Sequence, residues 1–315
     1  MDYIVLDLEW NQSPNGKGTE NKAVPFEIVE IGAIKLNADF EIVSEFSEII
    51  APRIYRQMHR ITQELIHLDM EQLSHGGAFP DVIRRFFDWC GSDYRFCTWG
   101  MMDLTELQRN MKYYDIDGHL GYPLVYYDVQ KLFSIAYEDR KSRRSLEYAI
   151  DYLKFDKDEA FHRAKSDAYY TALILEGLPR AVLKNYSIDY YRTPKNRKEE
   201  VYVVFDTYSK YISREFATKE RAMKDREVLS TRCYLCGNPA KKKLRWFSGG
   251  SRLYYSVSCC EEHGYLKGKI RLKKAENGKV FAVKTLKLVS PEEAEGIRER
   301  KEHIKEKRKK KALQE

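Results

Sequence analysis

The sequence predicts a mixed β-sheet covered by helices, followed by a smaller β-rich extension. Strand-like apolar segments open the chain at residues 3–10, 26–36 and 41–50. Beyond residue 60, apolar residues recur at three- and four-residue spacings, which is the period of amphipathic helices. Four of the six cysteines lie after residue 230, so the last part of the chain is of a different kind.

Helices and strands alternate through the first 190 residues. A turn at 37–39 separates the second strand from the third, and a further strand is predicted at 94–100. Helical spacing predicts helices over 61–68, 80–90, 102–114, 126–138, 145–153 and 163–183. Alternation of this kind favours a mixed sheet with helices on its faces.

A polar stretch at 192–200 (RTPKNRKEE) is the best linker candidate. It predicts a first domain over 1–190, a linker and small α/β connecting segment over 191–230, a cysteine-containing β-rich module over 231–290 and a basic tail over 291–315. The tail has almost no apolar stripe, so we expect either a solvated helix or a disordered segment there.

The net charge of +7 hides an acidic half and a basic half. Residues 1–190 carry 22 Lys and Arg against 31 Asp and Glu (−9), and the remainder carries 33 against 17 (+16). Gathered acids can hold metal ions and a basic surface attracts polyanions, so the halves suit one polyanionic substrate, unless both are solvated surfaces. Since no apolar run could span a membrane and the N-terminus lacks signal-peptide features, we expect a cytoplasmic protein without membrane contact.

Asp7 and Glu9 stand two residues apart near the end of the first apolar strand. Because strand side chains alternate, both project from one face. Two buried carboxylates repel each other unless a cation lies between them, and a divalent metal is the obvious candidate. A solvated strand end with two exposed acids is the competing interpretation.

Asp167 gives a second acidic position, on the last predicted helix of the domain. The inward stripe of that helix consists of Ala164, Ala168, Thr171, Leu175 and Leu178. Asp167 falls on this stripe, and His162 lies just upstream, where it can face the same cavity. Ordinary polar residues at a helix start would give the same pattern.

Asp103, which opens a helix after the strand at 94–100, supplies a third position. With Glu106 three residues later it also fits a capping box, and the two roles can coexist. Three aspartates and one glutamate together provide four negative charges, enough to balance two divalent cations, while a nearby histidine could deprotonate a water. This is the inventory of a two-metal phosphodiesterase.

The order of these motifs, D-x-E, then an Asp after W-G-x-x, then H-x-A-x-x-D, resembles the DEDDh 3'-to-5' exonuclease family over about residues 1–185. The segments LDLEWNQ, FEIVEIGAIKL, RITQEL and YDVQKLF are most similar to its histone-mRNA 3' exonuclease and KapD-like branch. The resemblance implies a ribonuclease-H-like fold and release of nucleoside 5'-monophosphates. It further implies His162 as general base and two Mg²⁺ or Mn²⁺ ions at Asp7, Glu9, Asp103 and Asp167.

The resemblance also marks Leu8 and Trp10, which flank Glu9, as nucleic-acid contacts. Many relatives have Thr or a small residue directly after the motif glutamate, where this chain has Trp10. A tryptophan there could stack on a terminal base or fill the edge of the sheet, which leaves the terminal-nucleotide preference open.

In the extension, Cys233-x2-Cys236 is followed about 25 residues later by Cys259, Cys260 and His263, a spacing typical of structural zinc. We expect a zinc-ribbon-like module whose ligands are Cys233, Cys236, His263 and one of Cys259 or Cys260. The segment between is short and polar with little core of its own, so metal would drive its folding. Unmetallated thiols are the alternative.

A basic and aromatic segment, KKKLRWFSGGSRLYYS, lies between the cysteine pairs. Cations for phosphates and aromatic rings for bases are what single-strand binding requires, although the rings could instead form the core of the module. The nucleic-acid contacts expected here are Lys241, Lys242, Lys243, Arg245, Trp246, Arg252 and Tyr254.

The sequence therefore predicts an exonuclease trimming single-stranded 3' ends, with the extension gripping upstream nucleotides or a ribonucleoprotein. RNA is favoured over DNA only by the resemblance, since nothing in the motifs reads a 2'-hydroxyl. A DNA proofreading or repair exonuclease and a catalytically silent nucleic-acid-binding module are the alternatives. The presence of all four acids and the histidine counts against the silent module.

Overall fold

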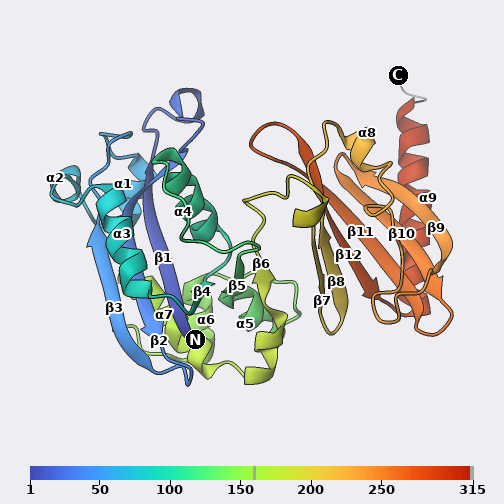
Figure 1. The fold of residues 1–315 in the computed structure, drawn as a ribbon, viewed down its shortest axis with the longest axis horizontal. Helices are drawn as coiled ribbons and strands as arrows, with labels where there is room; N and C mark the ends of the chain where they lie inside the picture. The colour runs from blue at the N-terminus through green and yellow to red at the C-terminus, as the bar shows by residue number, and fades with distance from the viewer. Residues whose placement is uncertain (159–160, 313–315) are drawn as a thin grey trace. The chain divides into compact units, whose positions relative to one another are not determined.

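The computed structural model describes residues 1–158 and 161–312, and the last three residues of the expected basic tail lie outside them. The chain forms two compact units, Met1–Asp189 and Tyr190–Glu315, each built on a six-stranded sheet (Figure 1). None of the described helices is both long and apolar enough to cross a bilayer.

The first unit contains the predicted mixed sheet, with strand order β3-β2-β1-β4-β5-β6. Its strands are β1 (Asp2–Gln12), β2 (Phe26–Leu36), β3 (Ile42–Ile49), β4 (Tyr94–Thr98), β5 (Val125–Asp128) and β6 (Ser187–Ile188). β1 lies in the middle, antiparallel to β2 and parallel to β4. A mixed α/β architecture is therefore confirmed.

Helices cover both faces of this sheet. They are α1 (Arg60–Ile66), α2 (Met70–Ser74), α3 (Phe79–Cys90), α4 (Met102–Tyr113), α5 (Val129–Tyr137), α6 (Leu146–Leu153) and α7 (Ala164–Gly177). Ile4, Leu6 and Leu8 of β1 pack with α3 and α4, while Val5 packs with α5, α6 and α7 on the opposite face. Side chains of alternating β1 residues thus enter two separate cores.

Two predicted helices differ from the observed ones at their ends. The segment 126–138 begins as strand β5, because Asp128 caps the helix that follows by accepting a hydrogen bond from the Lys131 amide (2.9 Å). The segment 163–183 ends its α-helix at Gly177 and resumes as a 3₁₀ turn at Arg180–Asn185. Pro179 lies between them and has no amide hydrogen to continue the helix.

The second unit is a six-stranded antiparallel sheet in the order β7-β8-β12-β11-β10-β9. Its strands are β7 (Val201–Val204), β8 (Tyr208–Ile212), β9 (Lys241–Gly250), β10 (Leu253–Cys260), β11 (Gly264–Lys274) and β12 (Val280–Leu288). The segment 191–230, expected as a connection, contributes β7, β8 and the short helix α8 (Lys219–Ala222) to this unit.

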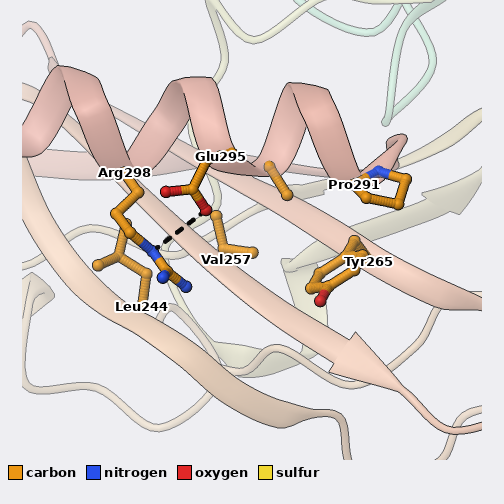
Figure 2. Close-up of a pocket in the computed structure, with 7 residues that line it drawn as sticks. Leu244, Val257, Tyr265, Pro291, Glu295 and Arg298 are labelled. Carbon is orange, nitrogen blue, oxygen red and sulfur yellow. Dashed lines mark ion pairs between the residues drawn. The ribbon is translucent and has the colours of Figure 1, made fainter.

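The extension has apolar cores of its own, contrary to the expectation of a module that only metal would fold. Ile270, Leu272 and Ala282 are buried with Tyr211 on the α8 side of the sheet. On the other side, α9 (Pro291–Ala312) packs Ala294 onto Leu244 and Val257 (Figure 2). The contact involves the first turns of the expected basic tail. The tail therefore begins as a helix packed on the sheet.

In the first unit, the first turn of α7 lies directly on Gly32 of β2. A Cβ atom at Gly32 would come within 2.0 Å of the Ala164 carbonyl carbon and 2.1 Å of the Lys165 nitrogen. Gly32 is also the cross-strand neighbour of Asp7. The missing side chain therefore lets α7 approach the sheet beside the acidic end of β1.

We expect Gly32→Ala to lower the free energy of unfolding of the first unit by roughly 1–3 kcal/mol or more, because backbone atoms cannot move aside as a flexible side chain would. Urea denaturation measures the change. Gly121→Ala is the matched control, since a Cβ there meets no atom within 4 Å. An equal free energy of unfolding in both variants would contradict the close approach of α7.

Candidate active site

Glu9, His162 and Asp167 come together beside the end of β1. Each offers one ligand atom, and these atoms lie within 4.8 Å of one another. The β1–β2 register shifts directly after Glu9, which marks a bulge. His162 has a left-handed φ of 61° just before α7, and Asp167 lies in the first turn of that helix. Residues more than 150 positions apart in the chain thus face one another.

Asp7 and Asp103 are not members of this tight group, but their charges act on it. Asp7 projects from the same face of β1 as Glu9. Asp103 is 6% exposed in the first turn of α4, and its carboxylate accepts hydrogen bonds from its own amide and from the Leu8 amide. Burial, followed by repulsion from Asp103, Asp167 and Glu9, raises the pKa of Asp7 well above its ordinary value.

The other three acids are perturbed in the same direction. Burial, reinforced by neighbouring carboxylates, raises the pKa of Glu9 to about 8. Burial also raises the pKa of Asp103 to about 7, although two backbone hydrogen bonds act against it. For Asp167, burial raises the pKa to about 6 in spite of the nearby His162. The protein alone therefore does not neutralise the charge that these acids would carry together.

Asp167 also has an unused buried acceptor. Its Oδ1 atom is buried without a hydrogen-bond partner among the described residues. Buried carboxylate oxygens are normally paired, and an unpaired one aimed into an acidic cluster is suited to a metal ligand. The donor set and this orphaned oxygen both fit a divalent cation.

The capping box expected as an alternative role for Asp103 is not formed. Met101 is the N-cap of α4 and makes no side-chain capping bond. The Glu106 side chain, 1% exposed, instead forms an ion pair with Arg109 at 2.5 Å. The alternative explanation for Asp103 is therefore removed.

Glu30 and Arg163 support the site and were missed from the sequence. Glu30 of β2 is fully buried and lies opposite Glu9 in the sheet. Its carboxylate accepts hydrogen bonds from Arg163 Nη2 at 2.8 Å and Nε at 3.2 Å. Arg163 follows His162 directly, so this ion pair holds the start of α7 against β2. The available signal was the pair of acids, Glu27 and Glu30, inside the largely apolar segment FEIVEIGAIKL.

The two residues that flank Glu9 are both engaged within the fold. The Leu8 side chain is buried in the core (3% exposed), and its amide donates a hydrogen bond to the Asp103 carboxylate. Trp10 is half-buried, and its ring centroid lies 5.6 Å from that of Phe26. The Trp10 ring therefore packs against Phe26 of β2 and the core beside it.

In the second unit, Cys233, Cys236, Cys260 and His263 bring their ligand atoms within 4.8 Å of one another. The Cys236 and Cys260 sulfurs are 3.6 Å apart, far beyond a disulfide bond, and Cys260 Sγ lies 3.7 Å from His263 Nδ1. Cys259 is outside the group, because adjacent strand residues point to opposite faces.

The expected nucleic-acid contacts of the second unit divide into two groups. The rings of Trp246 and Tyr254 pack against the core on the α8 side, and the Trp246 indole donates to the Leu229 carbonyl (3.0 Å) while lying over Gly268. The remaining side chains are exposed cations, namely Lys241, Lys242, Lys243, Arg245 and Arg252.

The fold and the site of the first unit define a class, that of α/β proteins with a cluster of acids at the end of a central strand. Residues 4–175, more than half of the chain, match the model of the exonuclease family (RNase_T). The chain belongs to this exonuclease family, as its motifs predicted.

Curated relatives are distant and longer. The chain is 23% identical over 162 residues to the 3'-5' exoribonuclease 1 of Rattus norvegicus, which covers 47% of this chain and 45% of that protein. It is 23% identical over 188 residues to the protein of the same name from Homo sapiens, covering 55% and 51%. The chain thus spans about half the length of the curated relatives it matches.

Solved structures are also similar, at still lower identity. The nuclease domain of 3'hExo, a DEDDh family member bound to rAMP, is 20% identical with a TM-score of 0.49, and the match covers 60% of this chain and 96% of that one. E. coli exonuclease I with a dA16 oligonucleotide is 12% identical with a TM-score of 0.48, covering 86% and 54%.

Arg163→Met should lower the free energy of unfolding by about 1–3 kcal/mol, because it leaves the buried Glu30 carboxylate without its cation. Urea denaturation reports the effect. Arg60→Met is the matched control, since Arg60 pairs with Glu64 at 2.9 Å on an exposed helix surface, where such a pair is worth about 0–1 kcal/mol. Equal losses in the two variants would show that the Glu30 pair does not hold α7.

Proposed function

We propose that the chain is a metal-dependent exonuclease that removes nucleotides from single-stranded RNA in the 3'-to-5' direction, releasing nucleoside 5'-monophosphates. The group that carries this proposal is Glu9, His162 and Asp167, whose ligand atoms lie within 4.8 Å of one another. Asp7 and Asp103 complete the acidic set through their charges.

The donor set fits Mg²⁺ or Mn²⁺, which prefer carboxylate oxygens. Asp7, Glu9, Asp103 and Asp167 would hold two such ions. When bound, two ions at such a site stabilise charge on the attacking and leaving oxygens of an in-line displacement. The raised pKa values of the four acids support this assignment, since cations would favour their charged forms.

His162 is assigned the role of general base. Its ring lies beside Glu9 and Asp167, where it can take the proton of the attacking water. The amide of His162 donates a hydrogen bond to Asp167, so the loop and the first turn of α7 hold each other in place. Arg163 lies between His162 and the first residue of α7. Its ion pair with Glu30 therefore positions both the His162 loop and the start of this helix.

RNA is proposed as the substrate because the curated relatives are named exoribonucleases. Release of labelled nucleotides from matched RNA and DNA oligomers tests this. Label at the 3' end should appear first as mononucleotide, and label at the 5' end only in progressively shortened oligomers. Equal rates on DNA would contradict the RNA preference, and release from the 5' end would contradict the polarity.

Asp167→Asn should abolish metal-dependent nucleotide release, because the amide removes one negative charge from the site while keeping the shape of the side chain. The initial rate of mononucleotide release with Mg²⁺ or Mn²⁺ measures it. Asp88→Asn, on the exposed side of α3, is the matched control and should retain the wild-type rate. Full activity in the Asp167 variant would remove this residue from the proposed site.

We also propose that Cys233, Cys236, Cys260 and His263 hold one structural Zn²⁺ ion. Three thiolates and one imidazole are a usual ligand set for structural zinc. The ion would tie the turn at 233–236 to the end of β10, and it would add to the apolar cores of this unit.

Cys260→Ala should lose most of the bound zinc, whereas Cys259→Ala should keep about one ion per chain as the wild type does. Elemental analysis of the dialysed proteins measures the metal-to-protein ratio. The pair is closely matched, since the two residues are adjacent on β10 and differ in the direction of their side chains. Loss of zinc in the Cys259 variant alone would overturn the assignment.

A further inference from the structure

Five cations gather on one face of the second sheet, and we call them the β11 basic face. Lys267, Lys269 and Arg271 occupy alternate positions of β11, and the residues between them, Gly268 and Ile270, are buried. Lys287 of β12 lies directly opposite Lys267. Arg300 of α9 stands 4.5 Å from the centre of the Tyr255 ring, and Tyr255 is the β10 neighbour of Lys269.

This arrangement is electrostatically unfavourable for the protein alone. Like charges directly opposite each other on adjacent strands are destabilising, which applies to Lys267 and Lys287. Within the described part of the chain, no carboxylate forms an ion pair with any of the five cations. Arg298 of α9 differs from these five cations, because it forms an ion pair with Glu295 at 3.6 Å (Figure 2).

Lys269 lies at the centre of this repulsion. Burial, followed by the charges of Arg271, Lys267 and Arg300, lowers the pKa of its amine. No acid is among the groups that act on it. An acid on a neighbouring strand could neutralise these positive charges. The residues opposite Lys269 and Arg271 on β12 are instead Thr285 and Val283.

We propose that the β11 basic face binds the phosphodiester backbone of single-stranded RNA. This inference rests on the proposed function for the identity of the polyanion. Cations two residues apart on a straight strand repeat at about 6.8 Å, which presents a linear row of charge to a linear polyanion.

The surroundings of the face favour a nucleic-acid strand over a membrane. A membrane-binding surface combines cations with exposed apolar residues that enter the lipid. The large apolar side chains that are exposed among the described residues of this unit are Tyr202, Val204 and Leu235. Tyr202 and Val204 pair with Tyr211 and Ser209 of β8, which point to the α8 side, and Leu235 lies in the cysteine turn.

The test compares RNA binding of the triple variant Lys267→Gln, Lys269→Gln, Arg271→Gln with that of the parent, both carrying Asp167→Asn so that the RNA is not degraded. Fluorescence anisotropy with a labelled 20-nucleotide oligouridylate is measured over a range of salt concentrations. Loss of three phosphate contacts should make the log–log salt slope shallower by about 2 and weaken binding on the order of 10²-fold at 0.1 M salt.

Two controls make the result specific. Lys219→Ala, Arg221→Ala, Lys224→Ala removes the same charge from exposed positions at and after α8, on the opposite side of the sheet, and should leave the affinity unchanged. The charge-conserving variant Lys267→Arg, Lys269→Arg, Arg271→Lys should bind like the parent. Because the glutamine variant relieves repulsion, its melting temperature should equal or exceed that of the parent.

An unchanged salt slope and affinity in the glutamine variant would overturn the inference. So would an equal loss in the α8-side control, or binding to phosphatidylserine vesicles without binding to the oligouridylate. Failure of the proposed function is recognised separately, since a wild-type chain that releases no nucleotide from a trinucleotide would lack nuclease activity whatever its affinity for long RNA.

Discussion

The contact between α7 and Gly32 of β2 fixes the geometry on which the acidic site depends. Gly32 is the cross-strand neighbour of Asp7, and the backbone of Ala164 and Lys165 occupies the space where a side chain would stand. Because Asp167 lies one turn further along the same helix, the approach of the backbone sets the distance between Asp167 and the acids of β1. The Glu30–Arg163 ion pair holds the same helix start from the neighbouring position of β2.

The site is costly for the fold that carries it. Each of the four acids has a pKa raised by burial, which means that their charged forms are disfavoured in the protein alone. The cores on both faces of β1 must offset this cost, since alternate residues of the strand are wholly buried there. A cation that binds only the folded state would raise the free energy of unfolding and so offset part of this cost.

The sequence was sufficient for features that are set locally. Alternation along β1 places Asp7 and Glu9 on one face, and helical periodicity places Asp167 on the inward stripe of α7. It was not sufficient for features set by strand register. Neither the pairing of Glu30 with Arg163 nor the role of Gly32 can be read until β2 is placed beside β1. For the same reason the sequence could not choose between Cys259 and Cys260 as a zinc ligand. Once the register of β10 is known, side-chain alternation places Cys260, and not Cys259, on the side of the other ligands.

The extension shows the same limit at a larger scale. Aromatic residues interleaved with cations in 241–256 indicated a binding segment, but Trp246 and Tyr254 turn toward the α8-side core, where the Trp246 ring lies over Gly268. The row of cations on β11 was not singled out, because its alternation of basic and apolar residues is typical of any solvated strand. The register shows that, among the described residues, the positions directly opposite this row on β10 and β12 hold no acid.

The two charged regions of the protein should respond differently to salt, and the reason is burial. The acids of the first unit are largely shielded from solvent, so added salt screens their mutual repulsion weakly, whereas a bound cation relieves it directly. The cations of the β11 basic face are partly or fully exposed, so salt screens their repulsion and competes with a polyanion for them. A largely buried cluster of like charge therefore favours a compact ion, whereas an exposed row of like charge suits a long strand that releases its counterions on binding.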